Sequence, residues 1–424
     1  MAERPNDVGA LHGAGYLTSL IMILVLSQRF ALPVGGTQIP AVVPLMCSAV
    51  LWGVLRGYLR WDRSRILLGL ATLVLLTGLA AVAQARGYRV SPLSLALLCS
   101  IYVVALVVPD RIGSGAVTAA LRAFSTLMTC CAAVGVGLFG AQYVGLAYRD
   151  WFTATVPEPF VQQGFVTAYP IAYLSPIYRS NGVIFLEASF YSLFLALGLL
   201  VTLYLGRSVF ASALLACAMI VTLSGNGMVV LLPGVAAMLL HPRYRRQLVK
   251  LLIPVALAAA LASATPLGAT FVSRTTEVQQ ANSSTSLRLV QPYLRLLPPA
   301  TESVEDVLLG HGPGSSDLYY EQNLPPEVVV GLLTPFFPKA LYEYGAFGVL
   351  LICAFLLQVF FDGPRRRPPW LIGLLLVYLL INAALLQPTL AYLTILFLGL
   401  LRPPDPDDLP GRGARASAVH GSAG

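Results

Sequence analysis

The stretch YRSNGVIFLEASFYSLFLALGLL, residues 178–200, combines a long apolar run with polar residues near its start. The run is long enough to cross a bilayer core of about 30 Å as a helix. Arg179, Asn181 and Gly182 precede it, and Glu187 lies inside it. A charge near the bilayer centre costs about 2.5–3.5 kcal/mol on insertion scales. We therefore expect a transmembrane helix over residues 183–205, with polar groups at its start that require an explanation.

The composition predicts a membrane protein. Hydrophobic residues make up 57% and charged residues 11% of the 424 residues, whereas charged residues are about 25% of an average soluble domain. The net charge is +8, but the basic residues form short clusters between apolar runs, which argues against a nucleic-acid partner. All six cysteines lie within apolar runs and show no spacing typical of disulfides or zinc sites.

Hydropathy and length predict an all-α polytopic membrane protein with about twelve transmembrane helices. The expected spans are residues 14–33, 39–55, 66–84, 92–109, 117–146, 183–205, 208–224, 227–240, 247–268, 336–361, 370–386 and 388–401. We expect residues 1–401 to form a single transmembrane domain. Residues 402–424 are rich in Pro, Gly and Asp and are expected to be a disordered cytoplasmic tail.

The basic clusters also predict an orientation. By the positive-inside rule, clusters such as RGYLRWDRSR at 56–65 and HPRYRRQLVK at 241–250 face the cytoplasm, which places both termini there. Two long loops, 147–182 and 269–335, then lie on the outer face. They contain five arginines that the same rule disfavours outside, namely Arg149, Arg179, Arg274, Arg288 and Arg295.

The second loop contains a segment with helical character, SSTSLRLVQPYLRLL at 283–297. Arg288 and Arg295 are two helical turns apart and would share a face, and Pro292 must kink or interrupt the helix. Partly opposite them lie Leu287, Val290, Leu294 and Leu297. We expect an amphipathic helix on the outer membrane surface. It leads into a glycine-rich turn with His311, the one histidine expected on the outer face.

Arginines and bases on the outer face predict a site for a lipid-linked diphosphate. Guanidinium groups bind phosphate in bidentate fashion and stay charged at any working pH. Glycosyl transfer from such a donor needs a base for the acceptor hydroxyl, or enough stabilisation of the leaving diphosphate that the base matters little. The available bases are Glu187, His311 and Glu343.

Structural explanations for the same residues stay open. The helix dipole favours a carboxylate in the first turn by about 0.3–1 kcal/mol, and Arg179 is an available partner for Glu187 at the interface. Contact with anionic lipid headgroups is an equal alternative for three of the arginines, Arg149, Arg274 and Arg295.

The glycine-rich turn GHGPGSS at 310–316 is not a Walker phosphate loop, and a tight turn with a solvated histidine is its structural alternative. Three nearby carboxylates match no calcium loop, so a solvated face is the favoured interpretation. They are Asp317, Glu321 and Glu327.

Several segments resemble the bacterial O-antigen polymerase and ligase superfamily, in particular its exopolysaccharide polymerases. The stretch 179–200 resembles the segment after the first large periplasmic loop, with Arg-x-Asn-Gly followed by a Phe-Leu-Glu-x-Ser helix start. TLSGNGMVVLLPGVAAMLL at 222–240 is similar to the paired short helices of that family. The arginine-led segment 286–316 and LYEYGAFGVLLICAFLL at 341–357 are similar to its amphipathic helix with a Gly-x-Gly turn and its Glu-x-Gly helix.

The resemblance implies a glycosyltransferase C-like membrane fold. It also implies a metal-independent, inverting glycosyltransferase without a cofactor, which uses polyprenyl-diphosphate-linked oligosaccharides on the outer face of the bacterial inner membrane. In residue terms, Arg179 and Glu187 match the first motif, Arg288 the arginine of the amphipathic helix, and Glu343 the Glu-x-Gly helix. The candidates for binding diphosphate are Arg179, Arg288, Arg295 and Lys339.

The chain departs from the family pattern at two places. Many members have a Ser-Arg pair where this chain has Ser224-Gly225-Asn226, and a His-Asn pair where it has TPFFPKALYEYG at 334–345. Three alternatives for the family histidine stay open: His311, Lys339, or activation by the diphosphate alone.

The expected function is polymerisation of lipid-linked repeat units into an exopolysaccharide or an O-antigen-like glycan. The alternatives are a ligase, which moves finished glycan to another acceptor, and a glycan or lipid transporter. The large outer loops and the lack of interrupted repeats disfavour the transporter. Besides membrane lipid, a flippase and chain-length or export proteins are the partners that this function implies.

Overall fold

The structure, a computed structural model, describes residues 5–34, 37–171, 175–240, 242, 244–245, 248, 286–287, 290–325, 334–361, 368–380 and 385–401. These residues are mostly helical. The longer helices are α1 (Pro5–Leu26), α2 (Val42–Leu55), α3 (Arg63–Ala85), α4 (Pro92–Tyr102), α5 (Ser114–Tyr143), α7 (Ala188–Leu205), α8 (Val209–Thr222), α9 (Asn226–Leu239), α13 (Gln291–Ala300) and α17 (Phe336–Phe361). The shorter ones are α6 (Trp151–Thr155), α14 (Val304–Leu309), α15 (Ser315–Asn323), α18 (Ile372–Leu380) and α19 (Pro388–Thr394), and the last continues as a π-helix, η5 (Ile395–Leu400).

Two small antiparallel sheets accompany the helices. Strands β1 (Ala31–Val34) and β2 (Thr37–Pro40) form a hairpin between α1 and α2. Strands β3 (Leu59–Trp61) and β4 (Val107–Pro109) pair at the two ends of the α3–α4 segment. These sheets join connections between helices, and Leu59 and Val107 of the second sheet belong to the main hydrophobic core.

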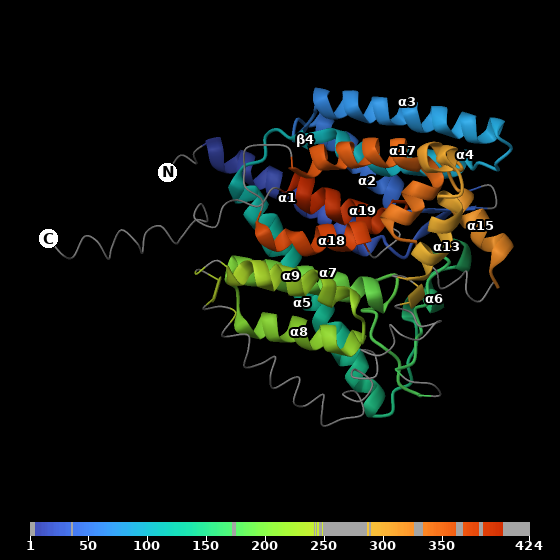
Figure 1. The fold of residues 1–424 in the computed structure, drawn as a ribbon. Coiled ribbons are helices and arrows are strands. Elements are labelled where there is room, and N and C mark those ends of the chain that lie inside the picture. The colour runs from blue at the N-terminus through green and yellow to red at the C-terminus, as the bar shows by residue number, and fades with distance from the viewer. Residues whose placement is uncertain are drawn as a thin grey trace.

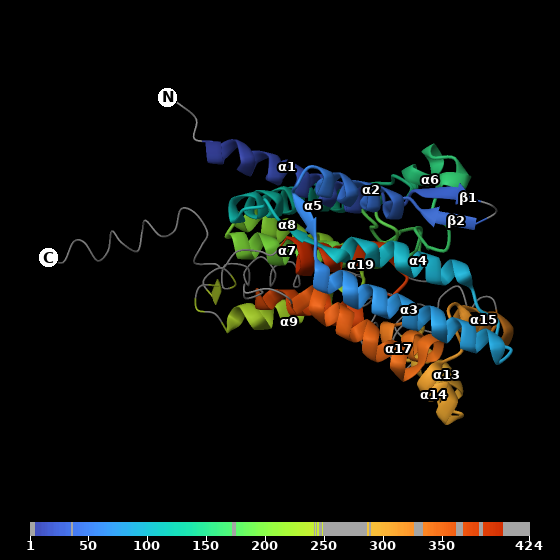
Figure 2. The ribbon, with the colours of Figure 1, turned by 90° about the horizontal axis from the view of Figure 1, so that it is seen from above.

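The long helices lie side by side along one axis (Figures 1 and 2). One end of the bundle carries α6, α13, α14 and α15, and we call it the loop end; α1 begins at the opposite end. Helix α7 is central, since it packs against α5, α8 and α9 and every side chain from Ser189 to Tyr204 is buried. A helix that is apolar on all sides is stable where neighbours or lipid cover all of it.

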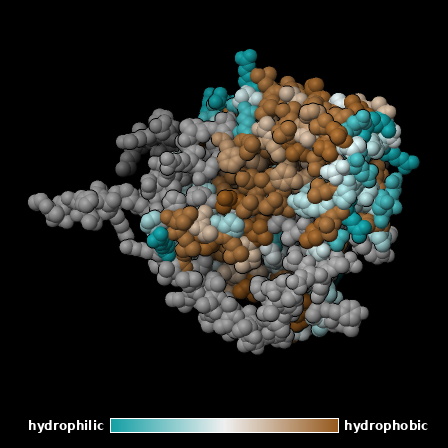
Figure 3. Space-filling model, in the orientation of Figure 1, coloured by the Kyte–Doolittle hydropathy of each residue, from teal (hydrophilic) through white to brown (hydrophobic). Residues whose placement is uncertain are grey.

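The outer helices expose apolar side chains. Leu67, Leu70 and Val74 of α3 and Leu350 and Leu357 of α17 are all more than half exposed. Figure 3 shows an apolar surface over the middle of the bundle, flanked by hydrophilic residues near the start of α3 and at the loop end. Water disfavours such a continuous apolar surface, whereas a bilayer covers it. The chain is therefore a helical membrane protein, as its composition predicts.

The predicted number of about twelve spans is not reached. In the described part of the chain, four helices are long and apolar enough to cross a membrane, namely α3, α5, α7 and α17. Helices α2, α8 and α9 have 14 residues each. At a rise of about 1.5 Å per residue they extend about 21 Å, short of a core of about 30 Å. Most of the expected span 247–268 and the tail 402–424 lie outside the described residues.

Helix α7 starts later than the predicted residue 183. Gly182 and Val183 have positive φ angles of 62° and 67°, and Glu187 has an extended backbone with φ −159°. Such dihedral angles do not continue a right-handed helix, so the helix begins at Ala188. Glu187 is the N-cap residue and not part of the first turns.

The predicted amphipathic helix exists as α13, but its buried face is different. Pro292 lies in the first turn of the helix, where a proline is tolerated and causes no kink. Pro292, Leu296 and Ala300 face inward at a spacing of four residues, whereas Leu294 is 62% exposed. Leu296 packs with Tyr320 and Tyr342. The partner helices α15 and α17 therefore select the buried face, which residue spacing alone does not identify.

Candidate functional site at the loop end

Helix α17 places Lys339 and Glu343 one turn apart, so that they form a buried ion pair with 2.9 Å between Nζ and Oε1. The Lys339 ammonium also lies 2.7 Å from Ser316 Oγ and 3.0 Å from Asp317 Oδ1. A lysine has three N–H donors, and these three partners use all of them. Direct binding of diphosphate by Lys339 therefore requires one of these partners to be displaced.

Glu343 keeps one free carboxylate oxygen. Ser316 donates a hydrogen bond of 2.6 Å to Oε1, the oxygen that also faces Lys339. The other oxygen, Oε2, has no hydrogen-bond partner among the described residues, although the side chain is fully buried. Leaving a buried acceptor unsatisfied costs about 1–3 kcal/mol, and more for a charged group. A bound water, or a ligand hydroxyl that reached it, would satisfy this acceptor.

A break in α17 positions Glu343 beside the glycine-rich turn. Gly345 has a φ of 60° and interrupts the helix. The freed carbonyls of Tyr342 and Glu343 accept hydrogen bonds of 2.9 and 2.8 Å from the backbone N–H groups of His311 and Gly312. A Cβ atom on Gly345 would lie 2.4 Å from the backbone of α14. Only glycine fits there, both for its dihedral angles and for the close approach.

His311 is buried and fully surrounded, so the alternative of a solvated histidine is wrong. Its Nδ1 lies 3.2 Å from the carbonyl oxygen of Tyr342, which can only accept, and therefore Nδ1 donates. Its Nε2 faces Asp306 Oδ1 at 3.6 Å. The ring stacks on Tyr342 and meets the edge of Tyr88. Neither ring nitrogen is open to a substrate in this arrangement, which disfavours His311 as the base.

Asp306 links this layer to α3. Its carboxylate accepts hydrogen bonds from Ser303 at 2.7 Å, Arg86 at 2.5 Å and Tyr88 at 3.2 Å. Burial opposes ionisation of this carboxyl, but the hydrogen bonds from Ser303 and Arg86 and the nearby His311 outweigh it and lower the pKa of Asp306. Arg86 also donates to the carbonyl of Gly310 at 3.1 Å. The turn around His311 is therefore fixed from two sides.

The first motif forms a second polar region. Arg179 is 9% exposed, and its guanidinium lies 4.2 Å above the ring of Tyr169. Its Nε has no hydrogen-bond partner in the described part of the chain. Asn181 Oδ1 accepts a 3.0 Å hydrogen bond from the backbone N–H of Val183 and shapes the turn.

Next to this turn lies a cavity of about 140 Å³. Its walls come from the end of α5, residues 146–151 and residues 180–183. Arg149 lies on the wall, with its guanidinium 4.8 Å above the ring of Trp151. Asn181 and Gly182 of the first motif therefore border a cavity, whereas Arg179 is not among the residues that line it.

The structure describes only some of the remaining predicted residues. Glu187 is partly buried at the start of α7, and Arg295 is exposed on α13, with its Nε 3.3 Å from Gln291 Oε1. Arg274, Arg288 and Glu327 lie outside the described residues. Asp317 is exposed, in agreement with the expected solvated face, but its carboxylate also binds Lys339.

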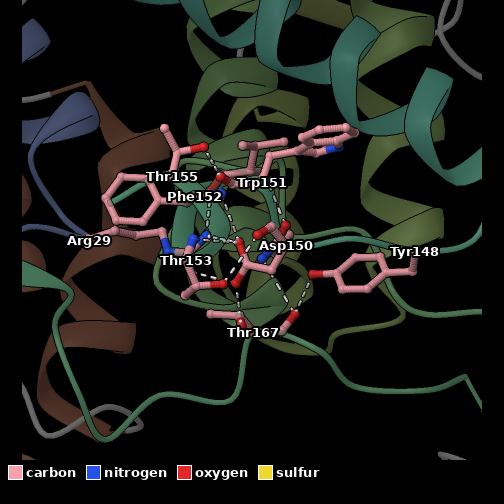
Figure 4. Close-up of polar contacts among 10 residues, drawn as sticks. Arg29, Tyr148, Asp150, Trp151, Phe152, Thr153, Thr155 and Thr167 are labelled. Atoms are coloured by element: carbon pink, nitrogen blue, oxygen red, sulfur yellow. Dashed lines mark hydrogen bonds and ion pairs between the residues drawn. The ribbon is translucent and has the colours of Figure 1, made fainter. Parts of the chain in front are cut away.

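Sequence reasoning did not single out a third feature, the ion pair of Arg29 and Asp150 (Figure 4). The Arg29 side chain is 2% exposed and that of Asp150 is 12% exposed. The available signal was an arginine near the end of the first expected span and a carboxylate in the first long loop. Nothing in the sequence pairs two residues that are 121 positions apart.

Buried polar atoms without a partner gather at the loop end. Within the described ranges they include side-chain atoms of Gln28, Arg179, Ser189 and Glu343, which follow α1, precede α7, begin α7 and lie in the first turns of α17, respectively. Helix α1 ends and helices α7 and α17 begin at the loop end (Figure 1), whereas two further unpaired atoms, in Gln358 and Trp370, lie at and beyond the opposite end of α17. Buried polar atoms in native proteins nearly always have a partner, so such a concentration indicates bound water or a polar ligand.

No protein-family model matches the chain, and a search of curated proteins finds no match.

Proposed function

We propose that the protein is a membrane glycosyltransferase that polymerises polyprenyl-diphosphate-linked repeat units into an exopolysaccharide or O-antigen-like glycan. The observation that carries this proposal is the unpaired Oε2 of the buried Glu343, together with the unpaired buried atoms of Gln28, Arg179 and Ser189 toward the same end of the bundle. A membrane-embedded glycan site needs many polar contacts beside an apolar surface that accommodates the lipid carrier. The loop end supplies both.

The arrangement suggests a division of roles. Glu343 Oε2 is the base that accepts the proton of the attacking sugar hydroxyl, because it is unpaired and its carboxylate is held by two other groups. Lys339 and Ser316 hold Oε1 and orient the carboxylate. Arg179, with an unpaired Nε, is the described arginine best placed to bind diphosphate.

The other predicted site residues take secondary roles in this proposal. Arg288 and Arg295 of the amphipathic segment assist with the diphosphate, Glu187 lies at the entrance to α7, and His311 fixes the turn on α17.

The proposal places the loop end in the periplasm of a bacterium, with both chain termini in the cytoplasm. It also counts the shorter apolar helices as spans, with the bilayer thinned or the helices extended at their ends. A flippase would deliver the lipid-linked repeat unit, and chain-length or export proteins would receive the product.

The first test compares lipid-linked glycans and surface polymer in the source cells with and without this protein. Single repeat units that accumulate on the lipid carrier, with no long chains, are the expected result. Long chains stranded on the carrier would instead indicate a ligase. Unchanged pools of both would contradict glycan transfer, and a transport assay would follow.

The second test addresses Glu343 directly. In Glu343→Gln the amide keeps the size of the side chain but cannot act as a base, and we expect polymerisation to fall by about 10²–10⁴-fold, the range for loss of general base catalysis. Glu321→Gln is the matched control, since Glu321 is exposed on α15. A normal rate in a folded, inserted Glu343→Gln protein would remove Glu343 from the mechanism.

A further inference from the structure

The ion pair of Arg29 and Asp150 also contacts the turn before α7. The guanidinium binds the carboxylate in bidentate fashion, with NH1 to Oδ1 at 2.8 Å and NH2 to Oδ2 at 2.6 Å. The same NH1 donates a 2.7 Å hydrogen bond to the backbone carbonyl of Val183. Phe152 packs 4.4 Å from the guanidinium and shields it (Figure 4). We call Arg29 and Asp150 the clamp.

The clamp holds a strained turn. Val183 has a φ of 67°, a left-handed conformation that β-branched residues rarely adopt. Such strain persists only where surrounding contacts enforce it, and it concentrates at functional sites. The bond from Arg29 to the Val183 carbonyl is a contact of this kind.

Asp150 extends the clamp into the loop. Its Oδ2 accepts a 2.7 Å hydrogen bond from Thr167 Oγ1, and its Oδ1 accepts backbone N–H groups at the start of α6. The backbone carbonyl of Thr167 in turn accepts hydrogen bonds from Tyr148 at 3.0 Å and Asn181 at 3.4 Å. Tyr148, Asp150 and the turn 180–183 all border the 140 Å³ cavity. The clamp therefore determines the position of two cavity walls.

We propose that Arg29 and Asp150 are positioning residues for substrate binding: they hold the turn Asn181–Val183, and with it the cavity walls, in the conformation that receives the lipid-linked substrate. The inference rests on the proposed function, since it assigns this cavity to the same reaction. It adds a positioning role for Arg29 and Asp150. Neither residue takes part in the reaction itself, because both side chains are occupied by each other and by the backbone.

The decisive experiment is a double-mutant cycle between Arg29→Gln and Val183→Gly. We expect Arg29→Gln to raise KM for the lipid-linked substrate about tenfold per folded protein, with kcat changed less than twofold. In the Val183→Gly background, the same Arg29→Gln change should alter KM less than twofold, because glycine adopts the left-handed turn without the clamp. Asp150→Asn should change KM in the same way as Arg29→Gln.

A purely structural ion pair gives a different pattern. It would lower the amount of active protein while leaving KM unchanged, and Val183→Gly would give no rescue; either result overturns the proposal. The matched control is Arg60→Gln, which breaks an exposed arginine–aspartate pair near the opposite end of the bundle and should leave KM unchanged.

A readout independent of activity separates this inference from the proposed function. Hydrogen exchange in residues 181–187 should become faster in Arg29→Gln, and in the double variant it should match the rate of the single variant Val183→Gly. Unchanged exchange in Arg29→Gln refutes the clamp whatever reaction the protein performs. If exchange responds as expected but the protein transfers no glycan, the proposed function fails and the positional role of the clamp stands.

Discussion

At the scale of single residues, Lys339 and Asp306 show how a buried charge is held by several partners. Lys339 uses all three donors, and the Asp306 carboxylate accepts from three side chains. Burying a charge without partners is costly. These contacts offset that cost and so allow Lys339 and Asp306 to be charged inside the bundle. Against this background the unpaired Oε2 of Glu343 is an exception, as is the unpaired Nε of Arg179.

Asp306 gives a prediction about pH. Its pKa in the folded protein is lowered from the usual 3.8, so its stabilising effect is fully present above about pH 3.8 and is lost as the pH falls through the lower folded value. We expect thermal stability in detergent to decrease as the pH falls below about 3.8, and Asp306→Asn to weaken this dependence.

The ion pair of Asp306 and Arg86 also gives an expected size for the loss of stability. Arg86→Gln should destabilise the protein by about 1.5–3 kcal/mol at neutral pH, the range for hydrogen bonds to charged groups. Glu321→Gln, at an exposed position, is the control for both variants. An Asp306→Asn protein with an unchanged pH profile would refute this assignment.

At the scale of elements, α17 organises the candidate site through its break. The break at Gly345 frees two carbonyls, and the glycine-rich turn after α14 satisfies them. A regular helix would bond these carbonyls internally and would leave the turn without an anchor. One irregularity in a long helix thus joins α14, α15 and α17.

This break predicts a strong and local effect of Gly345→Ala. The methyl group would meet the backbone of α14, and a left-handed conformation costs a non-glycine residue about 1–2 kcal/mol in addition. We expect a loss of about 2 kcal/mol or more in stability, measured by thermal unfolding in detergent. Gly137→Ala in α5 is the matched control, since no neighbouring atom lies within 4 Å of the place that a Cβ atom would take there, and helix propensity favours alanine by about 1 kcal/mol. Equal melting temperatures for both variants would contradict the role of the break.

At the scale of the whole molecule, the bundle separates an apolar middle from a polar loop end (Figure 3). Helix α7 begins at the loop end and finishes at the other, so Glu321 of α15 and Arg207 after α7 lie at opposite ends of the bundle. If the bundle spans the membrane as proposed, these two positions face different compartments.

Labelling with a membrane-impermeant thiol reagent tests this arrangement. In a background in which all six cysteines are replaced by alanine, Glu321→Cys should react in intact cells, whereas Arg207→Cys should react only after the membrane is opened. Both positions are exposed in the structure, so burial does not explain a difference. Reaction of both in intact cells would show that the two ends are not separated by the membrane, and the reverse pattern would invert the proposed orientation.

Local patterns in the sequence were enough to locate the helices. Every expected span within the described residues overlaps a helix, because apolar composition and helix formation are properties of neighbouring residues. The number of full spans was overestimated, since hydropathy windows include apolar turns that lengthen a run without lengthening its helix. The start of α7 was also misplaced, because Val183 adopts a conformation that its own preference disfavours.

The sequence by itself determined the membrane class, the helical segments and the residue types available for chemistry at the loop end. Only the tertiary structure decided how those residues are used: Lys339 is occupied, His311 is enclosed, Glu343 keeps one free oxygen, and Arg29 holds a turn that is distant in sequence. The physical reason is the range of each effect. Hydropathy and helix formation depend on adjacent residues, whereas pairing, burial and strain depend on which distant segments the folded bundle brings into contact.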